Sequence, residues 1–149
     1  MSKAYDKFEK TFNRSFGMIG RHYNIFREFV DSEEDVEWRE EDDDLFRAGI
    51  VLAVSAMDAY YTDRFCEALI PFIEKFGTNN KLMDLLHSSG FNTERAVTMF
   101  SNTRPKRVLS NLVRKKLRTF VTQDFKTIDN LYKCLGYNKS FTTSAQGIA

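Results

Sequence analysis

Apolar residues fall on almost every side of a helix in the segment Leu45–Phe65, LFRAGIVLAVSAMDAYYTDRF. One acid, Asp58, interrupts the apolar stretch. A helix that is apolar all round is surrounded by other helices or by lipid. Because this run is too short and too charged at its ends for a membrane span, the pattern predicts the central helix of a soluble helical bundle.

The first part of the chain predicts a long helix with one apolar stripe, from about Lys3 to Val30. Its apolar residues recur in steps of three or four, as a single stripe requires: Tyr5, Phe8, Phe12, Phe16, Ile19, Tyr23, Phe26 and Val30. Gly17 and Gly20 weaken this helix, but we expect them to let another helix approach closely. The acidic segment 31–44 is expected to be a loop or a solvated helix start, with Asp42, Asp43 and Asp44 favourably placed at the positive end of the core-helix dipole.

Proline and glycine positions predict where the remaining helices begin and end. The core helix is expected to continue to Phe76, with a kink or a new turn at Pro71 and an end at Gly77. Four further helices are predicted: 80–87 closed by Gly90, 93–100 capped at Asn92 or Thr93, 105–121 opened by Pro105, and 125–135 capped by Asp124 and stopped by Gly136. Residues 138–149 are a polar tail. The pattern therefore predicts one all-α helical bundle over 1–149, with about five to six helices.

The predicted helix 105–121 has one apolar and one basic face. Its inward positions are Val108, Leu112, Val113, Leu117 and Phe120. Its outward positions are Arg107, Arg114, Lys115 and Arg118, which could bind the phosphates of RNA. With only Phe120 nearby, base stacking is not implied on this face.

Charge is distributed unevenly along a chain whose net charge is only +1. Residues 31–44 hold ten acids and one Arg, whereas residues 104–139 hold ten bases and two acids. Such asymmetry indicates an anionic partner for the basic half. The other interpretation is that both segments are ordinary solvated surfaces.

Composition fits a single packed domain, since 42% of the 149 residues are hydrophobic and 14% are aromatic. Residues 1–20 lack the apolar region of a signal peptide, so a cytoplasmic location is expected. Cys66 and Cys134 lie inside helical patterns and are expected to be reduced, buried or half-buried thiols.

The sequence lacks the common catalytic motifs for phosphate-binding loops, zinc proteases and nucleophile elbows. His22 and His87 favour a structural role, and the acids of 31–44 do not have the turn chemistry of a calcium loop; we expect no metal and no cofactor. Asp58 is predicted to be a buried acid that needs a partner, commonly Arg. One interpretation is that Asp58 and its partner form a structural ion pair. The other is that Asp58 is a site acid that orients a catalytic Arg or a ligand. Asp63 follows five residues later.

Two segments resemble HEPN domains, most closely the RiboL-PSP-HEPN branch. Leu45–Phe65, with its AVSAMDAYYTDRF core, is similar to the central helix of that branch. Leu117–Tyr137, LRTFVTQDFKTIDNLYKCLGY, is similar to its segment of an aromatic residue, a capping polar residue, a short helix and LLG. The resemblance covers about residues 40–137 and implies an all-α bundle that dimerises.

Many members of this family are metal-independent ribonucleases of toxin–antitoxin and antiviral defence systems. The resemblance implies a signature of Arg, four to six residues, then His, near the last helix of the bundle. This chain does not contain it: neither His22 nor His87 has an Arg at that spacing before it. The expected position lies beyond Ala149, so the chain is either a fragment that lacks its final helix, which we favour, or a natural non-catalytic member. No catalytic residue is named; Asp58 is expected to support the missing Arg.

The sequence thus predicts a HEPN-type RNA-binding, ribonuclease-related domain of a defence system, not catalytic as it stands. Its expected partners are a second copy, RNA and an antitoxin or other protein, with no membrane. The alternative function is a non-enzymatic dimeric helical module that binds another protein. A third is a helical regulator that binds a nucleotide.

Overall fold

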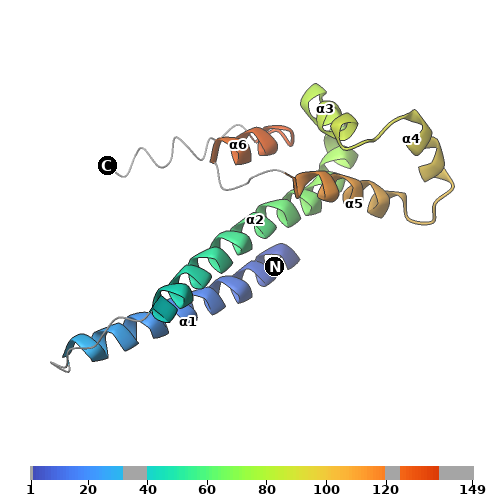
Figure 1. The fold of residues 1–149 in the computed structure, drawn as a ribbon. Helices are drawn as coiled ribbons and strands as arrows, with labels where there is room; N and C mark the ends of the chain where they lie inside the picture. Colours follow the sequence, from blue (N-terminus) through green and yellow to red (C-terminus); the bar gives the residue numbers. More distant parts are fainter. Residues whose placement is uncertain (1, 32–39, 120–124, 138–149) are drawn as a thin grey trace. The chain divides into compact units, whose positions relative to one another are not determined.

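The computed structural model describes residues 2–31, 40–119 and 125–137, and all regular secondary structure in these ranges is helical. This confirms the predicted all-α class. The helices, shown in Figure 1, are α1 (Lys3–Asp31), α2 (Glu40–Phe76), α3 (Asn80–Ser88), α4 (Thr93–Phe100), α5 (Pro105–Leu117) and α6 (Phe125–Lys133). The predicted cap Asp124, the inward Phe120 and the tail 138–149 lie outside the described residues. The chain divides into two compact units, Met1–Tyr60 and Tyr61–Ala149, and the prediction of one domain stays a prediction.

The three glycines predicted to end helices do so. Gly77, Gly90 and Gly136 have φ values of 75°, 84° and 74°, in the left-handed region that glycine adopts without a Cβ penalty. After α3 the amide of Phe91 donates to the carbonyl of Leu86 at 3.0 Å, which is the longer bond of a Schellman motif. These ends are local consequences of the sequence.

Asparagine side chains begin two of the short helices. Asn79 Oδ1 accepts the amide of Leu82 at 2.8 Å at the start of α3, and Asn92 Oδ1 accepts the amide of Arg95 at 2.9 Å at the start of α4. Each bond satisfies one of the amide groups that the first helical turn leaves without a partner. The predicted cap at Asn92 is confirmed, as is Pro105 in the first turn of α5.

The structure corrects the expectation of a new turn at Pro71, because α2 continues as one helix through this residue. Proline lacks the amide that would bond to the carbonyl four residues earlier, so one helical hydrogen bond is missing. The turn of α2 after Pro71 is stabilised because Phe72 and Ile73 pack against the buried core.

In the unit Met1–Tyr60, α1 runs antiparallel to the first part of α2 (Figure 1). The rings of Phe8 and Tyr60 lie 5.0 Å apart near one end of this pair, and those of His22 and Phe46 lie 5.4 Å apart near the other. The buried residues among those that the structure describes in this unit are small, as close packing of two helices requires: Ala4, Ser15, Gly49 and Ala56.

The predicted apolar stripe of α1 is used only in part: Phe8 and Ile19 lie against α2, and other members do not. Phe16 and Tyr23, which belong to the predicted stripe, are 58% and 61% exposed, whereas Ser15 is fully buried. Ser15 is tolerated there because its hydroxyl donates to the carbonyl of Phe12 at 2.7 Å. Hydrophobic periodicity alone predicted that the larger side chains Phe16 and Tyr23 would be buried.

A different glycine from those predicted permits the close approach of the two helices. A Cβ on Gly17 or Gly20 would meet nothing within 4 Å, so neither lies at a close contact. A Cβ on Gly49 of α2 would lie 2.8 Å from Cγ1 of Ile19 and 3.6 Å from the carbonyl oxygen of Ser15. The close contact of α1 and α2 is therefore at Gly49.

Within the unit Met1–Tyr60, the described residues do not enclose the first half of the segment Leu45–Phe65. Phe46, Ile50 and Val51 are 40%, 43% and 64% exposed. In its own unit this part of α2 packs against a single described helix, and one helix covers only one side of another.

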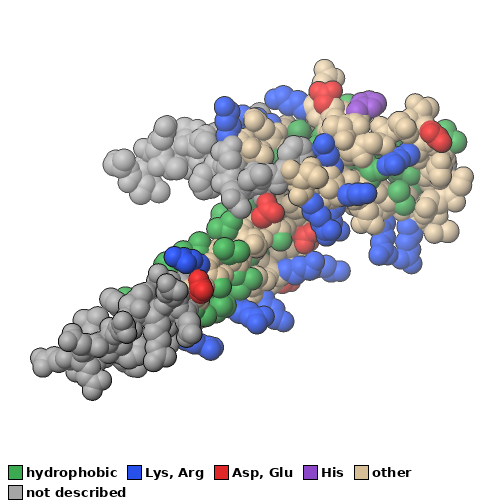
Figure 2. Space-filling model, in the orientation of Figure 1, with side chains coloured by type: hydrophobic (Ala, Val, Ile, Leu, Met, Phe, Trp, Pro, Cys, Tyr) green, Lys and Arg blue, Asp and Glu red, His purple; other side chains and the backbone are tan. Residues whose placement is uncertain are grey.

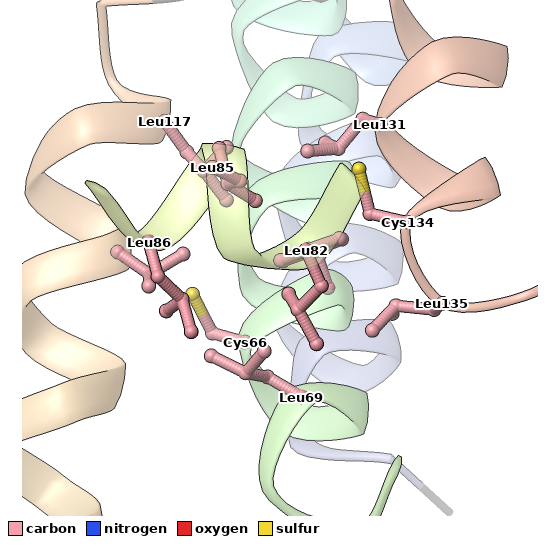
Figure 3. Packing of buried hydrophobic residues seen from close by; sticks show 11 residues of the cluster. Cys66, Leu69, Leu82, Leu85, Leu86, Leu117, Leu131, Cys134 and Leu135 are labelled. Carbon is pink, nitrogen blue, oxygen red and sulfur yellow. The ribbon is translucent and has the colours of Figure 1, made fainter. Parts of the chain in front are cut away.

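The second half of α2 belongs to the core of the unit Tyr61–Ala149 and fits the prediction. Phe65 and Leu69 of α2 are fully buried in one cluster with apolar residues of α3, α5 and α6 (Figure 3). The other members are Cys66, Leu82, Leu85, Leu86, Val113, Leu117, Leu131, Cys134 and Leu135. This core fixes one side of α5, and the opposite side carries the predicted basic residues.

Candidate functional site

The candidate site is the outer face of α5, which carries basic residues in its first and last turns. Val113 and Leu117 are fully buried, as predicted for the inner face, and Val108 and Leu112 are half-buried. On the other side Arg107, Lys115 and Arg118 are exposed. Lys and Arg side chains gather around α5 in the space-filling view (Figure 2). The 3.6-residue period places these charges opposite the core.

Three of the four predicted RNA-binding residues have no ion-pair partner among the described residues. These are Arg107, Lys115 and Arg118. A surface cation that is not already paired with a carboxylate can contact a phosphate without first breaking an ion pair. Lys106, which precedes them in the first turn, instead pairs with Glu74 of α2.

Arg114, the fourth predicted residue, has a different role in the structure. Its Nη2 lies 3.2 Å from Oδ1 of Asp63 on α2, and the two side chains are 35% and 22% exposed. A half-buried ion pair of this kind holds the guanidinium in place and satisfies part of its charge. Arg114 therefore joins α5 to α2.

The acid of the core helix that pairs with an Arg on α5 is Asp63, five residues after the predicted Asp58. Asp58 is half-buried, where the sequence predicted a buried acid. Asp129 of α6 is the buried carboxylate of the described residues, at 5% exposure. Sequence reasoning missed Asp129 because it lies in a short, mostly polar helix whose inner face is narrow.

Cys66 lies beside the ion pair, where its Sγ is 3.9 Å from the carbonyl oxygen of Ser110. Burial raises the pKa of the Cys66 thiol to about 11, and Arg114 opposes this shift in part. Burial also raises the pKa of Cys134. Both cysteines are free and buried, as predicted, and their neutral thiols are poor nucleophiles at physiological pH.

The two histidines lie in different units of the chain. The ring of His22 packs against Phe46, and His87 is exposed in the last turn of α3. Among the residues that the structure describes, no group of three or more His, Cys, Asp and Glu is placed to hold a metal ion. None of the described helices has both the length and the apolar character that crossing a membrane requires.

Comparisons of the chain with protein-family models, with curated proteins and with solved structures found no match.

Proposed function

We propose that this chain is an RNA-binding helical domain of the HEPN type, related to the ribonucleases of toxin–antitoxin and antiviral defence systems, and that it contacts RNA phosphates through the outer face of α5. The observation that carries the proposal is the exposure of Arg107 and Lys115 on α5 and of Arg118 at its C-cap, on a helix whose other side is buried. Because the core fixes this helix, the three charges keep a constant spacing. Such a surface binds the regularly spaced phosphates of a nucleic-acid backbone.

The resemblance to HEPN ribonucleases is used here for RNA binding and not for RNA cleavage. A ribonuclease of this type uses an Arg to stabilise the charged phosphate and a His to move a proton. This chain carries no Arg-x4–6-His signature, so we assign it binding and not cleavage. A metal-independent cleavage activity would need that signature from a further helix.

The direct test is RNA binding by the full chain and by the variant Arg107→Gln/Lys115→Gln/Arg118→Gln. We expect the triple variant to lose at least tenfold in affinity for a single-stranded oligoribonucleotide, measured by fluorescence anisotropy at low salt. A matched control removes three exposed charges from α1, in the variant Lys3→Gln/Lys10→Gln/Arg14→Gln, and should bind as the wild type does. Equal losses in both variants would mean that net charge alone, and not the α5 face, attracts the RNA.

The second candidate function is a non-enzymatic module that dimerises or binds another protein, such as an antitoxin. The observation that favours it is the exposure of Phe46, Ile50 and Val51 on α2, since clustered exposed apolar side chains mark interaction surfaces. This alternative predicts that neutralising the α5 charges changes nothing. RNA binding that is absent from the wild type at low salt would leave the interaction module as the better account.

A further inference from the structure

Four exposed residues of α5 and its C-cap form one row along the helix, which we call the α5 row: Arg107, Asn111, Lys115 and Arg118. They follow one another in steps of four, four and three residues. Such steps place side chains on the same face of a helix, one above another. At a rise of about 1.5 Å per residue, the row extends over about 16 Å of the helix axis.

Cations lie at both ends of the α5 row. Arg107 begins it, and Arg104 at the N-cap of α5 is exposed three residues earlier. Lys115 and Arg118 end the row and are also exposed. None of these four cations has an ion-pair partner among the described residues. The row therefore presents two separate pairs of cations to a ligand.

A neutral amide lies between the two pairs of cations. Arg107 and Lys115 are eight positions apart, which corresponds to about 12 Å of helix, and Asn111 is at the midpoint. The Asn111 side chain is exposed and makes no hydrogen bond to another residue that the structure describes. Its oxygen can accept and its NH₂ group can donate hydrogen bonds to a ligand.

The outer face of α5 offers no ring for an unpaired base to stack on. The sequence of α5, PKRVLSNLVRKKL, contains no aromatic residue. The large aromatic side chains that are exposed in the described part of the chain all lie on other segments. Surfaces that hold single-stranded RNA combine cations with aromatic side chains on which successive bases stack. The α5 row has the cations without the rings.

Base-paired RNA suits a surface with these properties. Its bases stack on one another, so that a protein meets mainly phosphates and 2′-hydroxyl groups. The minor groove of an RNA duplex is wide and shallow, with the phosphates of one strand along each edge and 2′-hydroxyl groups between them. A straight helix with cations at both ends and an amide in the middle matches this order of groups.

We propose that the α5 row binds base-paired RNA across its minor groove. Arg104 and Arg107 contact phosphates of one strand, and Lys115 and Arg118 contact phosphates of the other. Asn111 contacts the 2′-hydroxyl groups between them, so that RNA is preferred to DNA, which lacks this hydroxyl. The inference rests on the proposed function, because it names the class of RNA that the outer face of α5 binds.

The test compares three ligands by fluorescence anisotropy of the full chain at low salt. They are an RNA duplex of about 16 base pairs, one of its strands alone, and the DNA duplex of the same sequence. We expect the RNA duplex to bind about tenfold or more tighter than the single strand, and about fivefold or more tighter than the DNA duplex. The DNA duplex is the control for charge, since it carries the same number of phosphates as the RNA duplex.

The variant Asn111→Ala tests the contact with the 2′-hydroxyl groups. It should lose about fivefold in affinity for the RNA duplex and keep the wild-type affinity for the DNA duplex. Because Asn111 is exposed within a helix and alanine favours helix formation, we expect this variant to fold. The matched control is Asn80→Ala, which removes an exposed amide from α3 and should bind both duplexes as the wild type does.

The outcomes separate this inference from the proposed function. Equal affinities for the RNA duplex and the single strand, equal affinities for the two duplexes, or an Asn111→Ala variant that weakens both duplexes alike would each overturn the inference. The proposed function then stands, provided that the triple α5 variant loses affinity for single-stranded RNA. RNA binding that the triple α5 variant keeps in full overturns both.

Discussion

At the scale of single residues, the Asn79 side chain makes two hydrogen bonds, a combination that no other described asparagine side chain shows. Its Oδ1 caps α3, and its Nδ2 donates to the carbonyl of Cys134 at 2.9 Å, across 55 positions of sequence. One short side chain thus begins a helix and fastens it to the end of α6. Loss of this side chain leaves an amide and a carbonyl without their partners.

We predict that Asn79→Ala lowers the free energy of unfolding by about 2 kcal/mol, the sum of a cap and one further hydrogen bond. Asn92→Ala is the matched control, because Asn92 caps α4 with a bond of similar length, and should cost about 1 kcal/mol. Urea unfolding followed by circular dichroism measures both. Equal losses of unfolding free energy in the two variants would show that the hydrogen bond to the carbonyl of Cys134 does not add to stability.

The thiol of Cys66 predicts a specific dependence of stability on pH. Because its pKa rises from 9.0 to about 11 on folding, the folded chain holds this proton more tightly than the unfolded chain does. The stabilisation is therefore fully present below pH 9 and is lost as the pH rises towards 11. Comparing wild type with Cys66→Ala by urea unfolding cancels the titration of other groups. The difference between the two proteins should shrink over this range; a constant difference would contradict the shift.

At the scale of the helices, the contact of α1 with α2 depends on one glycine of three. Gly49 accommodates Ile19 and the backbone at Ser15, whereas Gly17 and Gly20 face open space. A helical glycine without a packing role costs stability relative to alanine, because it loses more conformational freedom on folding.

Gly17→Ala and Gly20→Ala should each raise the free energy of unfolding by about 0.5–1 kcal/mol. Gly49→Ala should give no such gain and should destabilise, because the new methyl group would lie 2.8 Å from Ile19 and force it to move. Thermal and urea unfolding of the three variants test this order. A stabilising Gly49→Ala would show that the helices separate easily at this point.

Helix type and helix ends could be predicted from the sequence because their causes are local. Pro105, Asn92 and the three left-handed glycines act within a few residues of themselves. The side on which α1 is buried could not be predicted as well. Which of Ser15 and Phe16 faces α2 depends on the rotation of α1 about its axis, and bulky residues on an uncovered side produce the same periodicity as a core.

The candidate site was predictable in part for the same reason. The basic face of α5 follows from its own period, so Arg107, Lys115 and Arg118 were placed correctly on the outside. The pairing of Arg114 with Asp63 depends on how α5 lies against α2, which the sequence does not state.

At the scale of the whole molecule, the proposed RNA binding depends on charge more than on the apolar core. The chain is nearly neutral, yet its positive charge is concentrated after residue 104, and α5 displays part of it on one rigid face. Electrostatic binding of this kind releases the counterions that surround a nucleic acid, so its strength falls steeply with salt. Binding to an apolar protein partner through α2 would depend only weakly on salt.

The salt dependence of RNA binding by the wild type and by the triple α5 variant shows whether the α5 charges contact RNA phosphates. For single-stranded RNA we predict that the slope of log affinity against log salt concentration becomes less negative by about 2 in the variant, since three phosphate contacts each contribute about 0.7. The same slope in both proteins, or RNA binding that is indifferent to salt in the wild type, would contradict the assignment of α5 as the RNA-binding face.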